Sequence, residues 1–270
     1  MASQALVSLP RPAFPKLVDG FVKGRVSIVM PAYNEVDFVV KSIASVKQQF
    51  GDLCDDYEII LVDDGSNDGT GKLVQNLKPS NVKVVSYGEN KGKGFAFRTG
   101  FNKVTGEYTF LVDSDLEIFP RELRAYFEAL RSSDVVIGSK RHPQSIVRTP
   151  AMRRFLSIGY NILERLLVGV RVSDTQVGLK GWKSAVLYKV VPLMSVKRYA
   201  FDLELLAIAS LLGASVKELP VNIELRVSLR PKQLFLMLID TLGIAYRLRI
   251  RRWYQKNLVD FSETYRSFIP

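Results

Sequence analysis

The feature that most constrains the fold is a regular alternation of strand-like and helix-like segments between residues 25 and 112. Short apolar runs rich in β-branched residues alternate with segments whose apolar side chains recur at helical spacing. The expected strands are residues 26–30, 57–62, 82–86 and 108–112, and the expected helices are residues 36–49, 69–77 and 92–104. Strands that alternate with helices form a parallel sheet with helices on both faces. We therefore expect an α/β fold whose ligands bind beyond the carboxyl ends of the strands.

The alternation is less regular after residue 113. Here we expect helices at residues 120–130, 149–167, 184–190 and 201–212, and strands at residues 135–138 and 216–225. The predicted organisation is an irregular lead-in at residues 1–24, one large α/β domain at 25–230, and a C-terminal amphipathic segment at 231–270. The single cysteine, Cys54, excludes an internal disulfide and is expected to be a small buried residue.

Charged residues are unevenly distributed along the chain. The 270 residues include 38 Lys and Arg against 27 Asp and Glu, a formal net charge of +11. Residues 1–120 hold 13 basic and 15 acidic side chains, whereas residues 121–270 hold 25 and 12. The positive excess of the C-terminal part indicates an anionic partner such as a nucleotide, a nucleic acid or a membrane surface. A nucleic-acid-binding module is disfavoured, because no recognition motif is present and the acidic clusters would repel phosphates.

Polar segments follow four of the expected strands. They are Pro31-Ala32-Tyr33-Asn34-Glu35, Asp63-Asp64-Gly65-Ser66-Asn67-Asp68-Gly69-Thr70, Asn90-Lys91-Gly92-Lys93-Gly94 and Asp113-Ser114-Asp115. Each of them alone is also explained as a turn or a helix cap. Their succession at the carboxyl ends of one sheet favours a binding site. The glycines beside Lys93 give this segment the freedom to approach a nucleotide, although the spacing is not that of a Walker A loop.

The last of these segments predicts a metal site. Asp113 and Asp115 are two residues apart, so both carboxylates face the same side of an extended backbone. Like charges this close are best explained by a shared divalent cation that bridges to a diphosphate, with solvated surface carboxylates as the alternative. Glu117 offers a further oxygen. We expect Mg²⁺ or Mn²⁺ at Asp113, Asp115 and Glu117.

Together, these motifs resemble glycosyltransferase family 2, whose members have the nucleotide-sugar-binding GT-A fold. The resemblance rests on Val-Ser-Ile-Val-Met-Pro-Ala-Tyr-Asn-Glu at 26–35, Asp-Asp-Gly-Ser at 63–66, Asn-Lys-Gly-Lys-Gly at 90–94 and Asp-Ser-Asp at 113–115. Val-Ile-Gly-Ser-Lys at 136–140, Asp-Thr-Gln-Val-Gly-Leu-Lys at 174–180 and Tyr-Ala-Phe-Asp-Leu-Glu-Leu-Leu at 199–206 are similar to polyprenyl-phosphate glycosyltransferases. The Asp-Thr-Gln and Ala-Phe-Asp forms look closer to dolichyl-phosphate glucosyltransferases than to dolichol-phosphate mannose synthases.

The resemblance implies roles for individual residues. Those implied to hold the nucleotide-sugar are Pro31, Tyr33, Glu35, Asp63, Asp64, Lys93, Gly94, Asp113 and Ser114. The catalytic candidates are Asp115, Asp174, Lys140 and Arg153, and the acceptor-phosphate candidates are Arg141, Arg148, Gln176, Arg226 and Arg230. Solvated surface is the alternative for each cation, and capping the next element or pairing with an arginine is the alternative for Asp174. Related mannose synthases often have Gln where this chain has Glu117, which leaves the third metal ligand open. His142, the only histidine, is expected to be a loop residue rather than a base.

The implied activity is inverting transfer of a hexose from a nucleotide-sugar, with UDP-glucose favoured, to a polyprenyl (dolichyl) phosphate. A lipid phosphate is already anionic, so the demand on the protein is electrostatic: two anions must be brought together and the leaving diphosphate neutralised. The alternatives are a GDP-mannose-dependent mannose synthase and a family 2 enzyme with a soluble acceptor.

The C-terminal part predicts contact with a membrane surface. Residues 232–256 join an apolar helical face to clustered arginines, and residues 149–167 have a similar character. Core packing of this tail with a solvated basic face is the competing interpretation. Because no apolar run approaches the length of a bilayer span and no secretion signal is evident, we expect a peripheral protein on the cytoplasmic face of a membrane.

Overall fold

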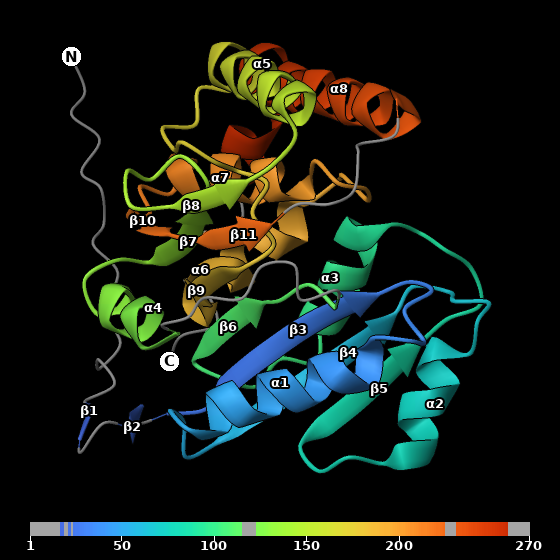
Figure 1. Ribbon diagram of the computed structural model, residues 1–270. Coiled ribbons are helices and arrows are strands. Elements are labelled where there is room, and N and C mark those ends of the chain that lie inside the picture. Colours follow the sequence, from blue (N-terminus) through green and yellow to red (C-terminus); the bar gives the residue numbers. More distant parts are fainter. Residues whose placement is uncertain (1–16, 19–20, 23, 115–122, 225–230, 259–270) are drawn as a thin grey trace.

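The computed structural model describes residues 17–18, 21–22, 24–114, 123–224 and 231–258. Within these residues, seven strands form the main sheet in the order β10-β7-β9-β6-β3-β4-β5 (Figure 1). They are β3 (Val26–Ala32), β4 (Tyr57–Asp63), β5 (Val82–Ser86), β6 (Tyr108–Leu111), β7 (Val135–Ser139), β9 (Lys180–Lys183) and β10 (Val216–Pro220). All neighbours pair in parallel except β9, which runs antiparallel to β6 and β7. This mostly parallel sheet confirms the expected α/β fold class.

Two further strand pairs lie outside the main sheet. One joins β8 (Ile146–Arg148) to β11 (Asn222–Glu224) in parallel, and the other joins β1 (Leu17–Val18) to β2 (Phe21–Val22) in antiparallel. The helices are α1 (Val39–Gly51), α2 (Thr70–Leu77), α3 (Lys93–Phe101), α4 (Leu123–Leu130), α5 (Ala151–Leu167), α6 (Ser184–Val190), α7 (Phe201–Leu211) and α8 (Pro231–Ala245). A 3₁₀ turn (η1, Val191–Leu193) follows α6, and a π-helical turn (η2, Tyr246–Ile250) follows α8.

Helices cover both faces of the sheet because its central strands are apolar on both sides. On β3, Val29 belongs to the core beneath α3, α6 and α7, whereas Ile28 and Met30 belong to the core beneath α1 and α4. Successive strand residues point to opposite faces, so one strand supplies both cores. The site-bearing loops are thereby fixed to a sheet that is buried on its two sides.

The expected elements are confirmed in type through residue 212, with small shifts at their ends. Helix α1 begins three residues later than the predicted position 36. The preceding residues form a turn in which the Glu35 carbonyl accepts from the amides of Phe38 and Val39, while the amides of Glu35 and Val36 donate to Thr70 Oγ1 at 2.9 Å and Asp68 Oδ2 at 3.0 Å. Strands β8 and β9 were not expected, because both are short and β9 carries a lysine at each end.

The expected strand at residues 216–225 is wrong as a single element. It divides into β10, which pairs with β7, and β11, which pairs with β8 in a separate sheet. Pro220 has no amide to continue the ladder, and the next amide, of Val221, donates to Ser145 Oγ at 3.0 Å. The chain therefore changes sheets at Val221.

Helices α5 and α8 lie side by side outside the main sheet (Figure 1). The Tyr160 hydroxyl of α5 and the Thr241 hydroxyl of α8 are 2.7 Å apart, and Thr241 is fully buried. The far sides of both helices carry exposed apolar residues. This pair thus presents a partly apolar outer surface while its inner side packs on the rest of the protein.

A buried carboxylate joins the C-terminal segment to the core. Glu204 of α7 is fully buried and accepts hydrogen bonds from the amides of Ser195 at 3.0 Å and Val196 at 2.8 Å. It also accepts from the Tyr254 hydroxyl at 2.5 Å, and Arg247 lies 3.5 Å away. Part of the tail is therefore core, as the competing interpretation of the sequence held. The domain boundaries at residues 24 and 230 stay predictions.

Glu204→Ala is expected to lower the free energy of unfolding by about 3 kcal/mol, because it leaves the buried Tyr254 hydroxyl, the Val196 amide and the partly buried Arg247 guanidinium without their acceptor. Chemical denaturation monitored by circular dichroism measures this loss. The control is Glu128→Ala, which breaks a solvent-exposed Glu128–Arg124 pair worth at most about 0.5 kcal/mol. Equal stabilities of the two variants would contradict the assigned role.

Candidate active site

The loops after β3 and β4 are bound to each other at the carboxyl edge of the sheet. Asn34 has a positive φ of 56°, and its amide donates to Ser66 Oγ at 2.9 Å. Its side-chain oxygen accepts from the Asn67 amide, also at 2.9 Å. Tyr33 is left 42% exposed at the rim of this edge. The segments that carry Pro31, Tyr33 and Glu35 on one side and Asp63 on the other therefore form one rigid unit, as their placement after neighbouring strands predicts.

Asp64 is committed to holding the next loop. Its carboxylate is buried and accepts hydrogen bonds from the Tyr87 hydroxyl at 2.7 Å and from the amides of Lys91 and Gly92 at 2.8 and 2.9 Å. Burial, together with the Asp64 hydrogen bond, raises the pKa of Tyr87 above its usual value. Asp63 accepts from the Ser66 amide in the same way. Both aspartates thus order backbone around the site, and their contact with a nucleoside stays a prediction.

The glycines around Lys93 serve a close approach within the chain itself. A side chain on Gly92 would lie 2.5 Å from the Lys197 carbonyl oxygen, and one on Gly94 would lie 2.6 Å from Phe201 Cβ. The Phe95 amide donates to the same Lys197 oxygen at 3.1 Å. The space that Gly92 and Gly94 leave is filled by residues 196–201, and the approach of Lys93 to a nucleotide stays a prediction. The α3 start is thereby pressed against the α7 start.

Asp113 follows β6 and faces Lys93. The Lys93 ammonium is 2.5 Å from Asp113 Oδ1, and both side chains are partly buried. The next residue, Ser114, is buried and its carbonyl accepts from the Ser42 hydroxyl of α1. Gly178 allows this arrangement, because any side chain there would overlap Asp113 Oδ2. Asp115 and Glu117, the other predicted metal ligands, lie outside the described residues.

Two charged residues that sequence reasoning missed lie beside this pair. Asp202 at the start of α7 is buried and pairs with the buried Lys180 of β9 at 2.7 Å. Burial is the main cause that raises the pKa of Asp202, and Lys180 and Lys93 oppose the rise. The available signals were the Ala-Phe-Asp and Leu-Lys motifs, but an acid in a first helical turn is ordinarily explained by the helix dipole.

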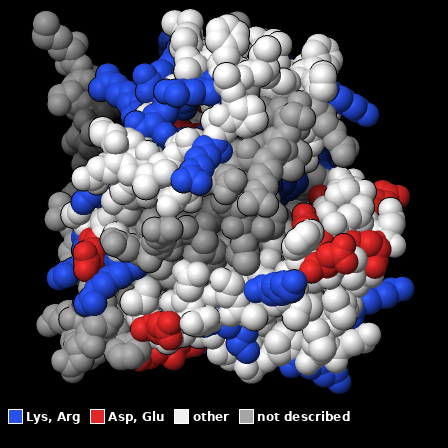
Figure 2. Space-filling view, viewed as in Figure 1, with Lys and Arg blue, Asp and Glu red and all other residues white. Residues whose placement is uncertain are grey.

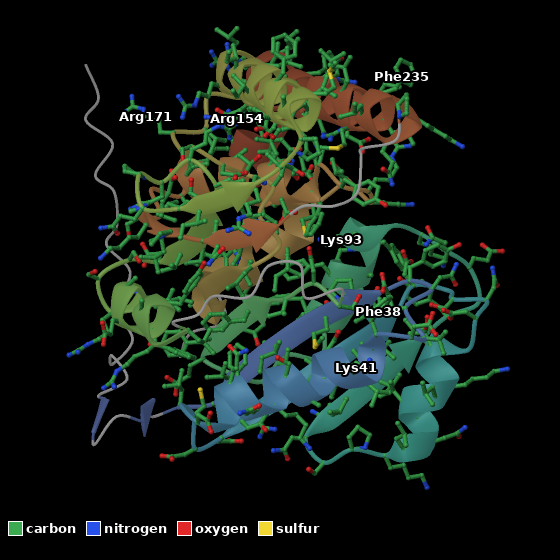
Figure 3. The ribbon with its side chains drawn as sticks, in the orientation of Figure 1. Phe38, Lys41, Lys93, Arg154, Arg171 and Phe235 are labelled. Atoms are coloured by element: carbon green, nitrogen blue, oxygen red, sulfur yellow. The ribbon has the colours of Figure 1, made fainter. Side chains whose placement is uncertain are left out.

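A cavity of about 770 Å³, called the central cavity here, extends from this charged cluster towards α5 and α8. Lys93 and Asp202 line one end, and Leu234 and Met237 of α8 line another part of its wall. Figure 3 shows Lys93 where the sheet meets the overlying helices, with Arg154 above it on α5.

The central cavity brings together only some of the predicted residues. Lys140, Arg141 and Gln176 line it, and so does Arg154, which was not predicted. Arg148 is exposed on β8 and is absent from the described lining. The side chain of Arg153 is not described, and Arg226 and Arg230 lie outside the described residues. His142 also lines the cavity, and its ring nitrogen accepts from the Gln144 amide at 3.3 Å within its own loop.

Asp174 and Arg141 hold the wall of the central cavity in place. Asp174 is buried, and its Oδ2 atom accepts from the Lys140 amide at 3.1 Å and lies 3.2 Å from the Lys140 ammonium. The Arg141 guanidinium donates to the Ser173 carbonyl at 2.5 Å and to the Ser157 carbonyl of α5 at 2.7 Å. Asp174 thus pairs with a lysine rather than with an arginine, and its catalytic role stays a prediction.

The sequence of this chain matches a known protein family. Residues 27–190, more than half of the chain, match the family model described as Glycosyl transferase family 2. The chain belongs to glycosyl transferase family 2.

The chain is similar in sequence to named glycosyltransferases. It is 30% identical over 216 residues to a dolichyl-phosphate beta-glucosyltransferase of Dictyostelium discoideum, with 73% of this chain and 65% of that protein covered. It is 32% identical over 207 residues to a polyprenol monophosphomannose synthase of Mycolicibacterium smegmatis, with 73% and 77% covered. This chain therefore spans slightly less than two thirds of the Dictyostelium relative.

The fold is similar to that of glucosyl-3-phosphoglycerate synthase from Mycobacterium tuberculosis, solved in complex with Mn²⁺, UDP-glucose and phosphoglyceric acid. The TM-score is 0.63 at 19% sequence identity, with 89% of this chain and 85% of that chain covered. This likeness confirms the expected GT-A fold.

The residues of the family 2 site fit a divalent cation in their chemistry. The predicted ligands Asp113, Asp115 and Glu117 are all carboxylates, the donors that Mg²⁺ and Mn²⁺ prefer. Asp113 is placed with its charge balanced by Lys93 and with Asp202 close enough to feel its field. Within the described ranges, no cluster of three or more metal-ligating side chains is complete. The metal assignment therefore depends on Asp113 together with two residues outside these ranges.

Gly178→Ala is expected to displace the Asp113 carboxylate and to weaken binding of a Mn²⁺–nucleotide complex. Overpacking typically costs about 1 to 3 kcal/mol, and a loss of that size in binding is roughly 5- to 150-fold in affinity. Isothermal titration calorimetry measures the change. The matched control is Gly159→Ala on α5, where an added side chain meets nothing within 4 Å. Unchanged affinity in a folded Gly178→Ala protein would disprove the role of this glycine.

Proposed function

We propose that this chain transfers a hexose from a nucleotide-sugar, with UDP-glucose the favoured donor, to the phosphate of a polyprenyl (dolichyl) phosphate. The observation that carries the proposal is the order of groups in the central cavity. Lys93 and Asp202 lie next to Asp113, the cations Lys140 and Arg141 line the wall, and apolar side chains of α5 and α8 complete it. An acceptor with one phosphate and a long apolar chain has the same order of chemistry. The named relatives support this choice of acceptor and sugar.

The residues answer the electrostatic demand of such a transfer. The acceptor phosphate is an anion at neutral pH, so it attacks the anomeric carbon without a strong base. Lys140 and Arg141 would attract it into the cavity, and Asp174 holds Lys140 in position. Lys93 is placed beside Asp113, where negative charge develops on the leaving nucleoside diphosphate. A Mg²⁺ or Mn²⁺ ion held by Asp113, with Asp115 and Glu117, would supply further neutralisation of that diphosphate. One displacement inverts the anomeric centre, so an α-linked donor yields a β-linked product.

GDP-mannose is the second candidate donor. The relative from Mycolicibacterium smegmatis, a polyprenol monophosphomannose synthase, is as similar to this chain as the glucosyltransferase relatives. The side chains that contact the sugar decide between the two donors, and a donor panel with the purified protein separates them.

Removing metal ligation is expected to stop transfer. EDTA should abolish incorporation of label from UDP-[¹⁴C]glucose into an organic-extractable product, and Mn²⁺ or Mg²⁺ should restore it. Asp113→Asn should lower the rate by about a hundredfold or more, because charge stabilisation of the leaving group is lost.

The control for this experiment is Asp134→Asn, which changes an aspartate that pairs with Lys183 at 3.0 Å, just before β7, away from the strand ends that carry the site. It should retain transfer. Label that enters only water-soluble products would favour a soluble acceptor. No transfer to any polyprenyl phosphate tested would contradict the lipid acceptor.

We further propose that α5 and α8 contact a membrane surface. Exposed apolar side chains line the outer sides of both helices: Met152, Phe155, Ile158, Ile162 and Leu166 on α5, and Phe235, Ile239 and Leu242 on α8. In Figure 2 uncharged residues, drawn white, lie along the top of the molecule, with Lys and Arg side chains gathered beside them. Apolar residues rimmed by cations are the arrangement of an interfacial helix. None of the helices in the described ranges is long and apolar enough to cross a membrane.

The cytoplasmic leaflet is the proposed surface. Its anionic lipids attract basic segments, and the basic residues of this chain are concentrated after residue 120. A peripheral position there would bring the α5–α8 end of the central cavity to the lipid phosphate.

Phe155→Glu and Phe235→Glu are expected to weaken binding to vesicles of phosphatidylcholine and phosphatidylglycerol, measured by flotation. These side chains are 74% and 62% exposed, and burying a Phe in an apolar phase is worth about 2 kcal/mol. Each variant should lose more than about tenfold in partitioning. The control Leu77→Glu changes an equally exposed apolar residue on α2 and should float like the unchanged protein. Full binding by both Phe variants would contradict membrane contact through α5 and α8.

A further inference from the structure

One buried carboxylate near the central cavity has no part in the proposed chemistry. Glu164 lies on α5, and its side chain is on the inner side of the helix with only 2% of its surface exposed. The outer side of the same helix carries Phe155, Ile162 and Leu166, all strongly exposed. Burying a carboxylate costs free energy, so an apolar residue at this position would stabilise the helix packing more if the position had no functional role.

The Glu164 carboxylate contacts the loop that follows Asp174. Its Oε1 atom accepts from the Thr175 hydroxyl at 2.6 Å and from the Gln176 side-chain amide at 3.4 Å. Thr175 is itself 2% exposed, so this hydrogen bond is shielded from water. Gln176 lines the central cavity. Glu164 therefore stands directly behind the cavity wall.

The same loop carries the groups that hold Lys140. The Gln176 backbone amide donates to Asp174 Oδ1 at 3.2 Å, and the other carboxylate oxygen of Asp174 lies 3.2 Å from the Lys140 ammonium. A chain of contacts thus runs from Glu164 through Thr175 and Gln176 to Asp174 and the cation at the cavity wall. Arg141 makes a second connection between this wall and α5, through the Ser157 carbonyl.

The surroundings of Glu164 disfavour its negatively charged form. Burial is the largest effect on the group and raises its pKa to about 7, with Asp174 adding to the rise and Thr175 and Gln176 opposing it. Tyr160, one turn earlier on α5, is the neighbouring titratable group on its own helix, and it also feels Asp240 of α8 and Asp202 of α7. Among the described residues, no Lys or Arg forms an ion pair with Glu164. The side chain therefore changes between a neutral and a charged form near neutral pH.

We propose that Glu164 is a positioning residue, which fixes the Asp174–Gln176 loop and the Lys140 ammonium against the acceptor phosphate. The inference rests on the proposed function for its acceptor, and it adds a residue that does not touch substrate. It also makes α5 the connection between the outer apolar surface and the cavity wall.

The test compares Glu164→Ala, Glu164→Gln and Thr175→Val with the unchanged protein. Loss of the anchor in Glu164→Ala and Thr175→Val should raise KM for the polyprenyl phosphate by roughly tenfold or more, because small misplacements of a binding group are costly. KM for the donor should not change, since the Lys93–Asp113 pair is untouched. Thr175→Val keeps the carboxylate and nearly the same side-chain volume, so it answers the question even if Glu164→Ala does not fold.

Glu164→Gln keeps an acceptor for Thr175 without charge, so it separates anchoring from titration. In the unchanged protein the acceptor KM should rise as the pH increases from 6 to 8.5, because a negative charge then forms behind the cavity wall. In Glu164→Gln this rise should be smaller, while the KM at pH 6 stays near that of the unchanged protein. The matched control is Glu58→Gln, another buried glutamate, which bonds Ser27, Thr105 and Lys83 away from the cavity. It should lower stability and leave the acceptor KM alone.

Hydrogen exchange of residues 173–177 gives a readout that does not need turnover. Exchange should be faster in Glu164→Ala and Thr175→Val and unchanged in Glu58→Gln. If the unchanged protein transfers sugar to no lipid phosphate, the proposed function fails and the exchange result alone decides whether Glu164 positions the loop. If transfer occurs but both anchor variants keep the acceptor KM and the exchange rates of the unchanged protein, the role of Glu164 is overturned.

Discussion

The site depends on balancing negative charge where several chain segments meet. Asp113 after β6 and Asp202 at the start of α7 come close enough to repel, and each has its own lysine: Lys93 from α3 and Lys180 from β9. Two carboxylates this close to each other and shielded from water are stabilised by the cations held beside them. The antiparallel strand β9 is what carries Lys180 into a sheet that is otherwise parallel. The antiparallel strand therefore supplies a positive charge at the acidic edge of the sheet. Gly92 and Gly94 let the first residues of α3 and α7 approach each other closely, so that the two aspartate–lysine pairs lie near each other.

The sequence predicts the fold well because the fold is repetitive at short range. Alternating apolar patterns identify the helices and most of the strands between residues 25 and 212, although not β8 or β9, and the polar segments after the strands identify Asp113 and Lys93. Long-range packing decides the rest. Asp202 and Lys180 are unremarkable in their own segments and acquire meaning only when α7 and β9 meet at the cavity. Likewise Asp64 has the sequence context of a ligand-binding residue, yet its oxygens hold residues 87–92. The division of residues 216–225 between two sheets follows from a proline and from a side-chain acceptor, Ser145, that is 76 residues before its donor Val221 in sequence.

The uneven charge of the chain has a spatial counterpart. The near-neutral N-terminal part forms the strands and loops around Asp113, where acids predominate, and the basic C-terminal part supplies Lys140, Arg141, Arg154 and the helices at the outer surface. A single cavity spans the two parts. In the proposed reaction the basic wall would attract the lipid phosphate, whereas the donor diphosphate would rely on Lys93 and on a divalent cation at the acidic wall.

The carboxylate of Glu204 has a consequence for how this protein can be divided. It receives hydrogen bonds from residues 195 and 196 and from Tyr254, so one buried group joins the loop that leads into α7 to the last described segment. Residues 231–258 for that reason contribute to the folded core as well as to the apolar surface. A shortened chain ending near residue 230 would lose the partners of an internal carboxylate together with Ile244, Leu248 and Tyr254 from the core. The proposed lipid-facing surface and the stability of the catalytic domain are, in this sense, encoded by the same segment.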